Sequence, residues 1–209
     1  MVFILFSENM KKNKPFIKIE RKWSKRINLI TAVLLFIAAT LFYINSTKIP
    51  EGMFEDPKTG KPMLLGEVLI DELKQEPFSE WYNNEFDNYE LDVELLGAIS
   101  DPNQYNYELF LGTWCGDSRR EVPRLEKIFI ELGIDFNRIA IITVDRDKVS
   151  PENEQEGKDI RYVPTLIVKN NDVEIGRIVE SPSSESATLE SDLFEISLGI
   201  PPKPNYSLD

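Results

Sequence analysis

The chain of 209 residues contains no histidine, which excludes a histidine general base and metal binding by histidine. Its acidic residues outnumber the basic ones by 36 to 24, for a net charge of −12. The basic residues gather at the amino end, where residues 1–26 have a net charge of +6 and leave −18 for the remainder. An acidic body without a basic stripe excludes nucleic acid as a partner, because phosphate contacts need clustered lysine and arginine.

An apolar segment follows this basic head, residues 1–26. Residues 27–47 carry no charge and are apolar on every side of a helix, which predicts a helix that crosses a membrane. Because a basic flank stays in the cytoplasm, we expect a single-pass protein with residues 48–209 outside the cytoplasm, in a periplasm-like compartment. Ala38-Ala39 could serve as a cleavage site for a signal peptidase, but the apolar stretch continues to Ile44, so we favour an uncleaved anchor.

Composition divides the rest of the chain into four parts. Residues 48–63 are rich in proline, glycine and charge and predict a linker. Residues 64–103 predict a helical extension, in which five aromatic side chains between Phe78 and Tyr89 should seal one side of a core rather than bind unfolded substrate. Residues 104–198 form the folded domain, and residues 199–209, with three prolines, a flexible tail.

Strand and helix patterns alternate along residues 104–198, as is typical of an α/β domain. In chain order we expect a strand at 107–113, a helix at 118–132 interrupted by Pro123, an apolar strand at 139–144, a hairpin of strands 165–169 and 174–179, and a helix at 184–198. The polar residues 145–161 predict a loop. Its first residues, Asp145, Arg146 and Asp147, should end a strand in solvent rather than bind a metal.

The one cysteine, Cys115, lies where a strand pattern stops and a helical pattern begins. Unpaired backbone N–H groups and the positive end of the helix dipole at such a position favour a thiolate over a thiol. Asp117 disfavours a thiolate, whereas Arg119 and Arg120 favour it. Position therefore argues for a nucleophile, although free cysteines are more often buried residues that fill space.

Four features resemble the thioredoxin superfamily, and they cover roughly residues 104–198. They are Trp114-Cys115-Gly116-Asp117-Ser118, which matches the family's Trp-Cys-x-x-Cys with serine as the last residue; Pro123, where family members often kink the active-site helix; the strand Ile139–Asp145; and Val163-Pro164-Thr165, where the family keeps a cis proline against the active-site sulfur. The resemblance implies a thioredoxin-like α/β fold with a central mixed β-sheet flanked by helices. It also implies an active site made of Trp114, Cys115, Gly116, Asp117, Ser118 and Pro164.

Two departures limit what the resemblance implies. Ser118 replaces the resolving cysteine, so no internal disulfide can form, and Leu109 stands where many thioredoxins have a buried acid. We therefore expect Cys115 to form mixed disulfides with disulfide- or thiol-bearing protein substrates, which an external reductant releases, rather than to act in a dithiol reductase. Ser118 would donate a hydrogen bond to the thiolate, and Trp114 would shield one side of the sulfur. No cofactor or metal is expected.

Two other functions remain open. One is a thioredoxin-fold binding or chaperone module whose redox chemistry is lost, as the missing cysteine and acid allow. The other is a monothiol glutaredoxin-like carrier of an iron–sulfur cluster, because Cys-Gly-Asp-Ser is similar to the Cys-Gly-Phe-Ser of such proteins. We rank it last, since Trp114 is typical of thioredoxins and Thr113 stands where the carriers have a lysine.

Overall fold

The computed structural model describes residues 21–46 and 49–204, which form two units, Met1–Lys48 and Ile49–Asp209. Most of the expected basic head and the last five residues of the expected tail lie outside the described residues. The described part of the first unit is one helix, α1 (Arg21–Ser46).

Helix α1 does not meet the expectation of a transmembrane helix. In the part of the chain that the structure describes, no helix is long and apolar enough to cross a membrane. The fold class is therefore α/β with a mixed sheet and helices, and the predicted single transmembrane helix is wrong.

The second unit is built on a five-stranded sheet in the order β3-β5-β4-β6-β7. Its strands are β3 (Gly66–Glu67), β4 (Asn106–Leu111), β5 (Ala140–Thr143), β6 (Thr165–Asn170) and β7 (Val173–Val179). β4 and β5 are parallel, whereas the other three neighbouring pairs are antiparallel, so the sheet is mixed. Two parallel strands need a crossover connection, and the helix that follows β4 supplies it.

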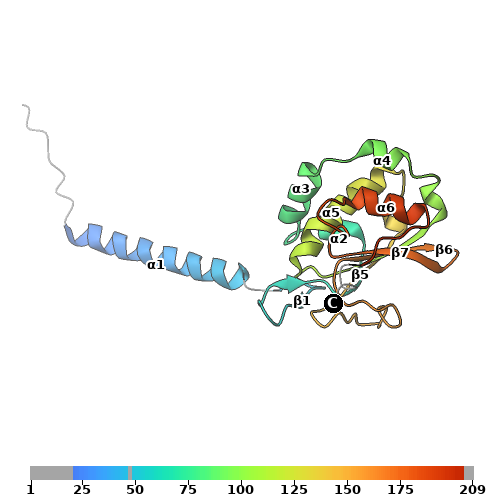
Figure 1. Cartoon of the computed structure of the whole chain (residues 1–209). Helices are drawn as coiled ribbons and strands as arrows, with labels where there is room; N and C mark the ends of the chain where they lie inside the picture. Colours follow the sequence, from blue (N-terminus) through green and yellow to red (C-terminus); the bar gives the residue numbers. More distant parts are fainter. Residues whose placement is uncertain (1–20, 47–48, 205–209) are drawn as a thin grey trace, which may run out of the picture. The chain divides into compact units, whose positions relative to one another are not determined.

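Five helices of this unit lie on one side of the sheet (Figure 1). They are α2 (Ile70–Leu73), α3 (Ser79–Asn88), α4 (Val93–Gly97), α5 (Gly116–Glu131) and α6 (Leu189–Ser197). Short 3-10 turns occur at Pro102–Gln104 and Phe136–Arg138. Alternate side chains of β4, such as Leu109 and Leu111, join the helices in the larger core. The five aromatic residues of 78–89 are buried in this core or packed against it, as predicted.

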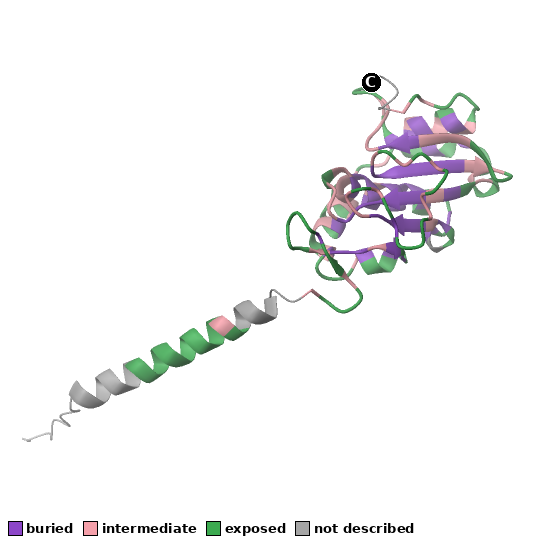
Figure 2. Cartoon of the chain, turned by 90° about the horizontal axis from the view of Figure 1, so that it is seen from below, coloured by how far each residue is buried: buried purple, intermediate pink, exposed green. Residues whose placement is uncertain are grey.

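The opposite side of the sheet carries a smaller core made of Phe110, Ile142, Val144, Val163 and Ile167. Residues 144–164, the segment between β5 and β6, cover this smaller core and contain no helix or strand. Figure 2 shows the strands in purple, as buried, beneath exposed green loops. We call the two sides the helix-covered face and the loop-covered face. The segment predicted as a linker contributes a hairpin of β1 (Phe54–Glu55) and β2 (Pro62–Met63).

Two helices differ from the predicted ones. α5 is continuous through Pro123, so the predicted interruption is wrong. The proline removes one backbone hydrogen bond, while the buried apolar face of α5 packs on the sheet and holds the helix. α6 begins at Leu189 rather than at 184, because Thr188 caps it: its Oγ1 accepts the N–H of Ser191 at 3.1 Å, and Ser191 Oγ accepts the N–H of Thr188 at 2.9 Å.

Candidate functional site

Cys115 is the N-cap residue of α5, at the end of a turn that follows β4. Its N–H donates to the carbonyl of Gly112 at 2.8 Å, and its carbonyl accepts the N–H of Arg119 at 3.1 Å. The side chain is partly exposed and does not cap the helix. Its Sγ instead donates to the carbonyl of Val163 at 3.1 Å. The turn thus presents a thiol at the surface and fixes it against the backbone before β6.

Pro164 lies where the sequence predicts it. The Val163–Pro164 peptide bond is cis and both residues are buried. The carbonyl of Pro164 accepts the N–H of Glu180 at 2.7 Å, which connects the start of β6 with the end of β7. The expected proximity of this backbone to Cys115 is confirmed by the contact between Sγ and Val163.

Trp114 is fixed at three points. Its Nε1 donates to the carbonyl of Val144 at 2.9 Å, and its indole covers Gly112 so closely that a Cβ there would lie 2.6 Å from the ring. The guanidinium of Arg146 lies over the indole, 4.8 Å from the ring centroid. Trp114 therefore forms a rigid wall next to Cys115 on the loop-covered face.

Ser118 and Gly116, two of the predicted active-site residues, differ in their surroundings. Ser118 is completely buried, and its Oγ accepts the N–H of Gly112 at 3.2 Å. The hydroxyl therefore braces the turn before the cysteine. Gly116 is exposed, with nothing within 4 Å of the place of a Cβ, so the surface beside Cys115 is open on this side.

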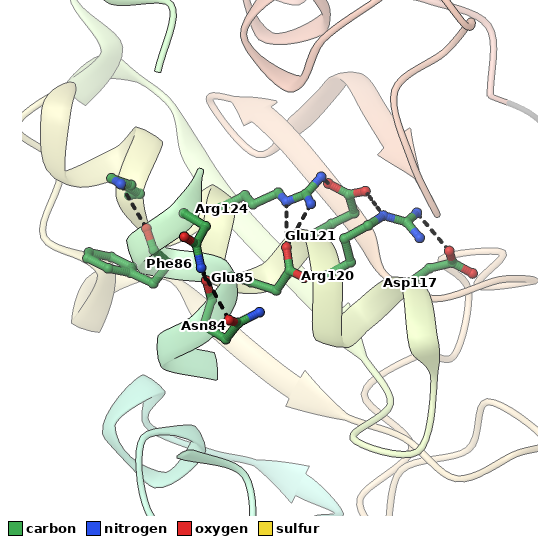
Figure 3. A network of polar contacts seen from close by, with 9 residues as sticks. Asn84, Glu85, Phe86, Asp117, Arg120, Glu121 and Arg124 are labelled. Carbon is green, nitrogen blue, oxygen red and sulfur yellow. Dashed lines mark hydrogen bonds and ion pairs between the residues drawn. The ribbon is translucent and has the colours of Figure 1, made fainter. Parts of the chain in front are cut away.

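The charged residues at the start of α5 pair mainly with one another. Arg120 contacts Asp117 at 2.7 Å and also Glu121, while Arg124 contacts Glu85 of α3 at 2.7 Å (Figure 3). Glu121 is only 3% exposed, between the two arginines. Burial lowers the pKa of Arg120, but pairing with the two carboxylates raises it more, so the net shift is upward. Both arginines that were predicted to favour a thiolate therefore have other partners. Arg120 belongs to this network, and Arg119 Nε donates to the carbonyl of Thr113 at 2.7 Å.

Sequence reasoning missed an ion pair beside the site. Arg146 was expected in solvent, but its Nε and Nη2 donate to the two carboxylate oxygens of Asp56 at 2.6 and 2.8 Å. Asp56 is 1% exposed, and these hydrogen bonds hold its pKa well below the ordinary value despite burial. The turn sequence Asp56-Pro-Lys-Thr-Gly60 is a signal that a capped turn occurs here, although it does not name the partner.

Glu180 is a second residue that the sequence did not indicate. It follows β7 with a φ of 61°, in the left-handed region. Burial, and then the negative charge of Asp117, raise the pKa of its carboxyl. A partly buried acid therefore lies on the α5 side of Pro164. A cavity of about 520 Å³ opens nearby between α5 and the segment after β7, lined by Arg120, Glu121, Ser181, Pro182 and Ser184 among others.

No group of three or more acidic, cysteine or histidine side chains within the described ranges could hold a metal ion. No protein-family model matches the chain, and no curated protein does. Among solved structures, the chain is similar to a protein of unknown function from Pseudomonas aeruginosa, at 18% identity and a TM-score of 0.38. The match covers 58% of this chain and 76% of the other. A likeness of this size carries no argument about function.

Proposed function

We propose that the protein performs thiol–disulfide exchange through the single nucleophile Cys115. The observation that carries this proposal is the placement of the sulfur: it is partly exposed at the N-terminus of the 16-residue helix α5 and lies 3.1 Å from the carbonyl of Val163. Helix N–H groups and dipole stabilise an anion at this position. The juxtaposition with the backbone before Pro164 is also the one that the resemblance to the thioredoxin superfamily implies.

The reaction needs no group beyond the substrate and an external thiol. The Cys115 thiolate attacks one sulfur of a partner's disulfide, a new S–S bond forms to Cys115, and the other sulfur leaves as a thiolate. A second thiolate, from the partner or from a small thiol, then attacks the mixed disulfide and restores Cys115. The protein returns to its thiolate form after each cycle, with no net oxidation or reduction, because Ser118 offers no second thiol with which an internal disulfide could form.

Ser118 has a structural role in the turn before Cys115, which favours exchange with an external thiol over release of the substrate by an internal disulfide. Its Oγ is engaged with the N–H of Gly112, so the position braces the turn. We therefore expect long-lived mixed disulfides with protein disulfides and rapid release by an added thiol. A redox-inactive binding module is the alternative, and it predicts a Cys115 that forms no adduct.

The test uses the full chain and a model disulfide, 4,4′-dithiodipyridine, whose released thiopyridone absorbs light. We expect one equivalent of thiopyridone per chain and a mixed disulfide that glutathione removes. Cys115→Ser should abolish both signals. Ser118→Cys should release two equivalents and leave an internal disulfide, because a second thiol then lies one helical turn from the first. A folded chain that releases no thiopyridone at neutral pH would refute the proposal.

A further inference from the structure

The ion pair of Asp56 and Arg146 joins the β1–β2 hairpin to the loop that follows β5. Asp56 accepts both hydrogen bonds of the guanidinium, a third from the N–H of Lys58 at 3.2 Å and a fourth from the hydroxyl of Thr59. All four come from groups in fixed positions around a buried carboxylate. The guanidinium therefore has a defined place, which a solvent-exposed arginine would lack.

The guanidinium stacks on Trp114, the residue before Cys115, and the indole is itself bonded to the carbonyl of Val144. Cys115 and Trp114 both pack on the small core of the loop-covered face. Hydrogen bonds to Asp56 are the main cause of a raised pKa of Arg146, and a negative charge on Cys115 acts in the same direction. Because the guanidinium lies over the side chain that precedes Cys115, both groups belong to the same small region of the loop-covered face.

We propose that Arg146 is the electrostatic partner of Cys115, stabilising negative charge on the sulfur from its place on Trp114, and that Asp56 is the positioning residue that holds it there. This inference rests on the proposed function for its use in exchange. It assigns to the hairpin of residues 54–63 a part in the site. Arg120 of α5 contacts two carboxylates, Asp117 and Glu121, whereas Arg146 contacts one, Asp56. Arg119 is held by the carbonyl of Thr113.

The experiment measures how fast Cys115 reacts with a neutral reagent, iodoacetamide, and with an anionic one, iodoacetate. A nearby positive charge favours the anionic reagent beyond its effect on the sulfur. Arg146→Met should lower the iodoacetate rate about tenfold and the iodoacetamide rate about threefold, since a fixed charge at short range is worth this order. Arg146→Lys should restore most of the iodoacetate to iodoacetamide ratio. Asp56→Asn removes a negative charge, which by itself would raise this ratio. We expect a fall of about twofold, because the guanidinium loses the hydrogen bonds that hold it on Trp114.

The matched control is Arg177→Met, which removes another partly buried arginine paired with a carboxylate, Glu174 at 2.6 Å. We expect its ratio to equal that of the wild type. A purely structural role of Arg146 would slow both reagents equally and leave the ratio unchanged, which would overturn the inference. The wild-type chain gives a second test that needs no variant: added salt should slow iodoacetate and spare iodoacetamide. Equal salt effects on both reagents would also overturn it.

These readouts are separate from the test of exchange. If the wild-type chain forms no mixed disulfide but the reagent ratio depends on Arg146, the proposed function fails while the electrostatic partnership stands. If mixed disulfides form and the ratio does not change in Arg146→Met, exchange stands and the partnership fails.

Discussion

The two faces of the sheet are held by different forces. On the helix-covered face, α2 to α6 bury a large apolar core in which aromatic rings meet edge to face, such as Tyr107 and Phe129 at 4.7 Å. On the loop-covered face, five residues form a small core that ion pairs surround. Glu108 of β4 contacts Lys158 at 3.0 Å and Lys169 at 2.6 Å there.

This difference explains why the candidate site lies where it does. The apolar side chains of the helix-covered face are buried beneath its helices. At the edge of the loop-covered face, a thiol, an indole and a guanidinium can be fixed by hydrogen bonds and still contact solvent. Stability and reactivity thus have separate places on the same strands, and the variants below test that separation.

The largest expected effect comes from two neighbours on β5 that point to opposite faces. Ile141 is 1% exposed in the helix-covered core, and Ile142 is 3% exposed in the loop-covered core. We expect Ile141→Ala to lower the free energy of unfolding by about 4 kcal/mol and Ile142→Ala by about 2 kcal/mol, because a loop relaxes into a cavity more readily than packed helices do. Chemical denaturation measures both. Equal losses would show that the two faces are equally rigid.

The second largest loss of stability is expected when the ion pair of Asp56 and Arg146 is broken. Asp56→Asn leaves the Arg146 guanidinium in a partly buried place without its carboxylate, and we expect a loss of about 3 kcal/mol. The pair of Arg161 and Asp159, in which both side chains are exposed, gives the control: Asp159→Asn should leave the free energy of unfolding unchanged. If both substitutions cost the same, the loop-covered face does not depend on its buried ion pair.

The pH dependence of the same pair has a definite sign. The pKa of Asp56 is held far below its ordinary value by hydrogen bonds from Arg146. The unfolded carboxyl therefore takes up a proton near pH 4 while the folded one does not. The stabilisation is fully present above that pH and is lost as the pH falls below it. Asp56→Asn should remove this part of the acid sensitivity, which unfolding measured from pH 6 to pH 3 would detect.

Much of the helix-covered face could be predicted from the sequence. The patterns of residues 107–113, 139–144 and 165–179 gave four strands within one or two residues of their ends, because alternation and apolar runs reflect burial directly. The aromatic spacing of residues 78–89 gave α3 for the same reason. Leu109 lies at the centre of this core and is fully buried.

The loop-covered face could be predicted less well. Cys115 and Pro164 have local sequence signals, and the structure brings them together. Asp56 and Arg146 are separated by 90 positions, and a carboxylate in a turn does not identify its partner. Nothing local distinguishes Glu180 from an exposed glutamate either. Pairings of this kind depend on how the loops pack, which periodicity does not encode.

A smaller loss of stability is expected when the packing of Trp114 against Gly112 is disturbed, and Gly116 provides a control close by. Gly112→Ala would place a Cβ 2.6 Å from the Trp114 indole, so the indole must move or the turn must open. We expect a loss of about 2 kcal/mol, with a change in tryptophan fluorescence. Gly116→Ala, where the same atom has nothing within 4 Å, should change the free energy of unfolding by about 0.5 kcal/mol or less. Similar effects of both variants would contradict a rigid Trp114.

The smallest effect is expected at Glu180, which follows β7 and lies on the α5 side of Pro164. Burial and the charge of Asp117 raise the pKa of its carboxyl, so the folded state holds a proton that the unfolded state has already lost. The charged carboxylate then costs stability above that range, and Glu180→Gln should add about 0.5 kcal/mol at pH 7, a modest value because the group is partly exposed. The gain should vanish below about pH 4, where the unfolded carboxyl is protonated as well. Glu185→Gln, at an exposed position of the same segment, is the control and should change nothing at either pH. A loss of stability in Glu180→Gln at pH 7 would mean that the carboxylate makes a favourable contact. Glu180 would then stabilise the folded state near the site instead of destabilising it.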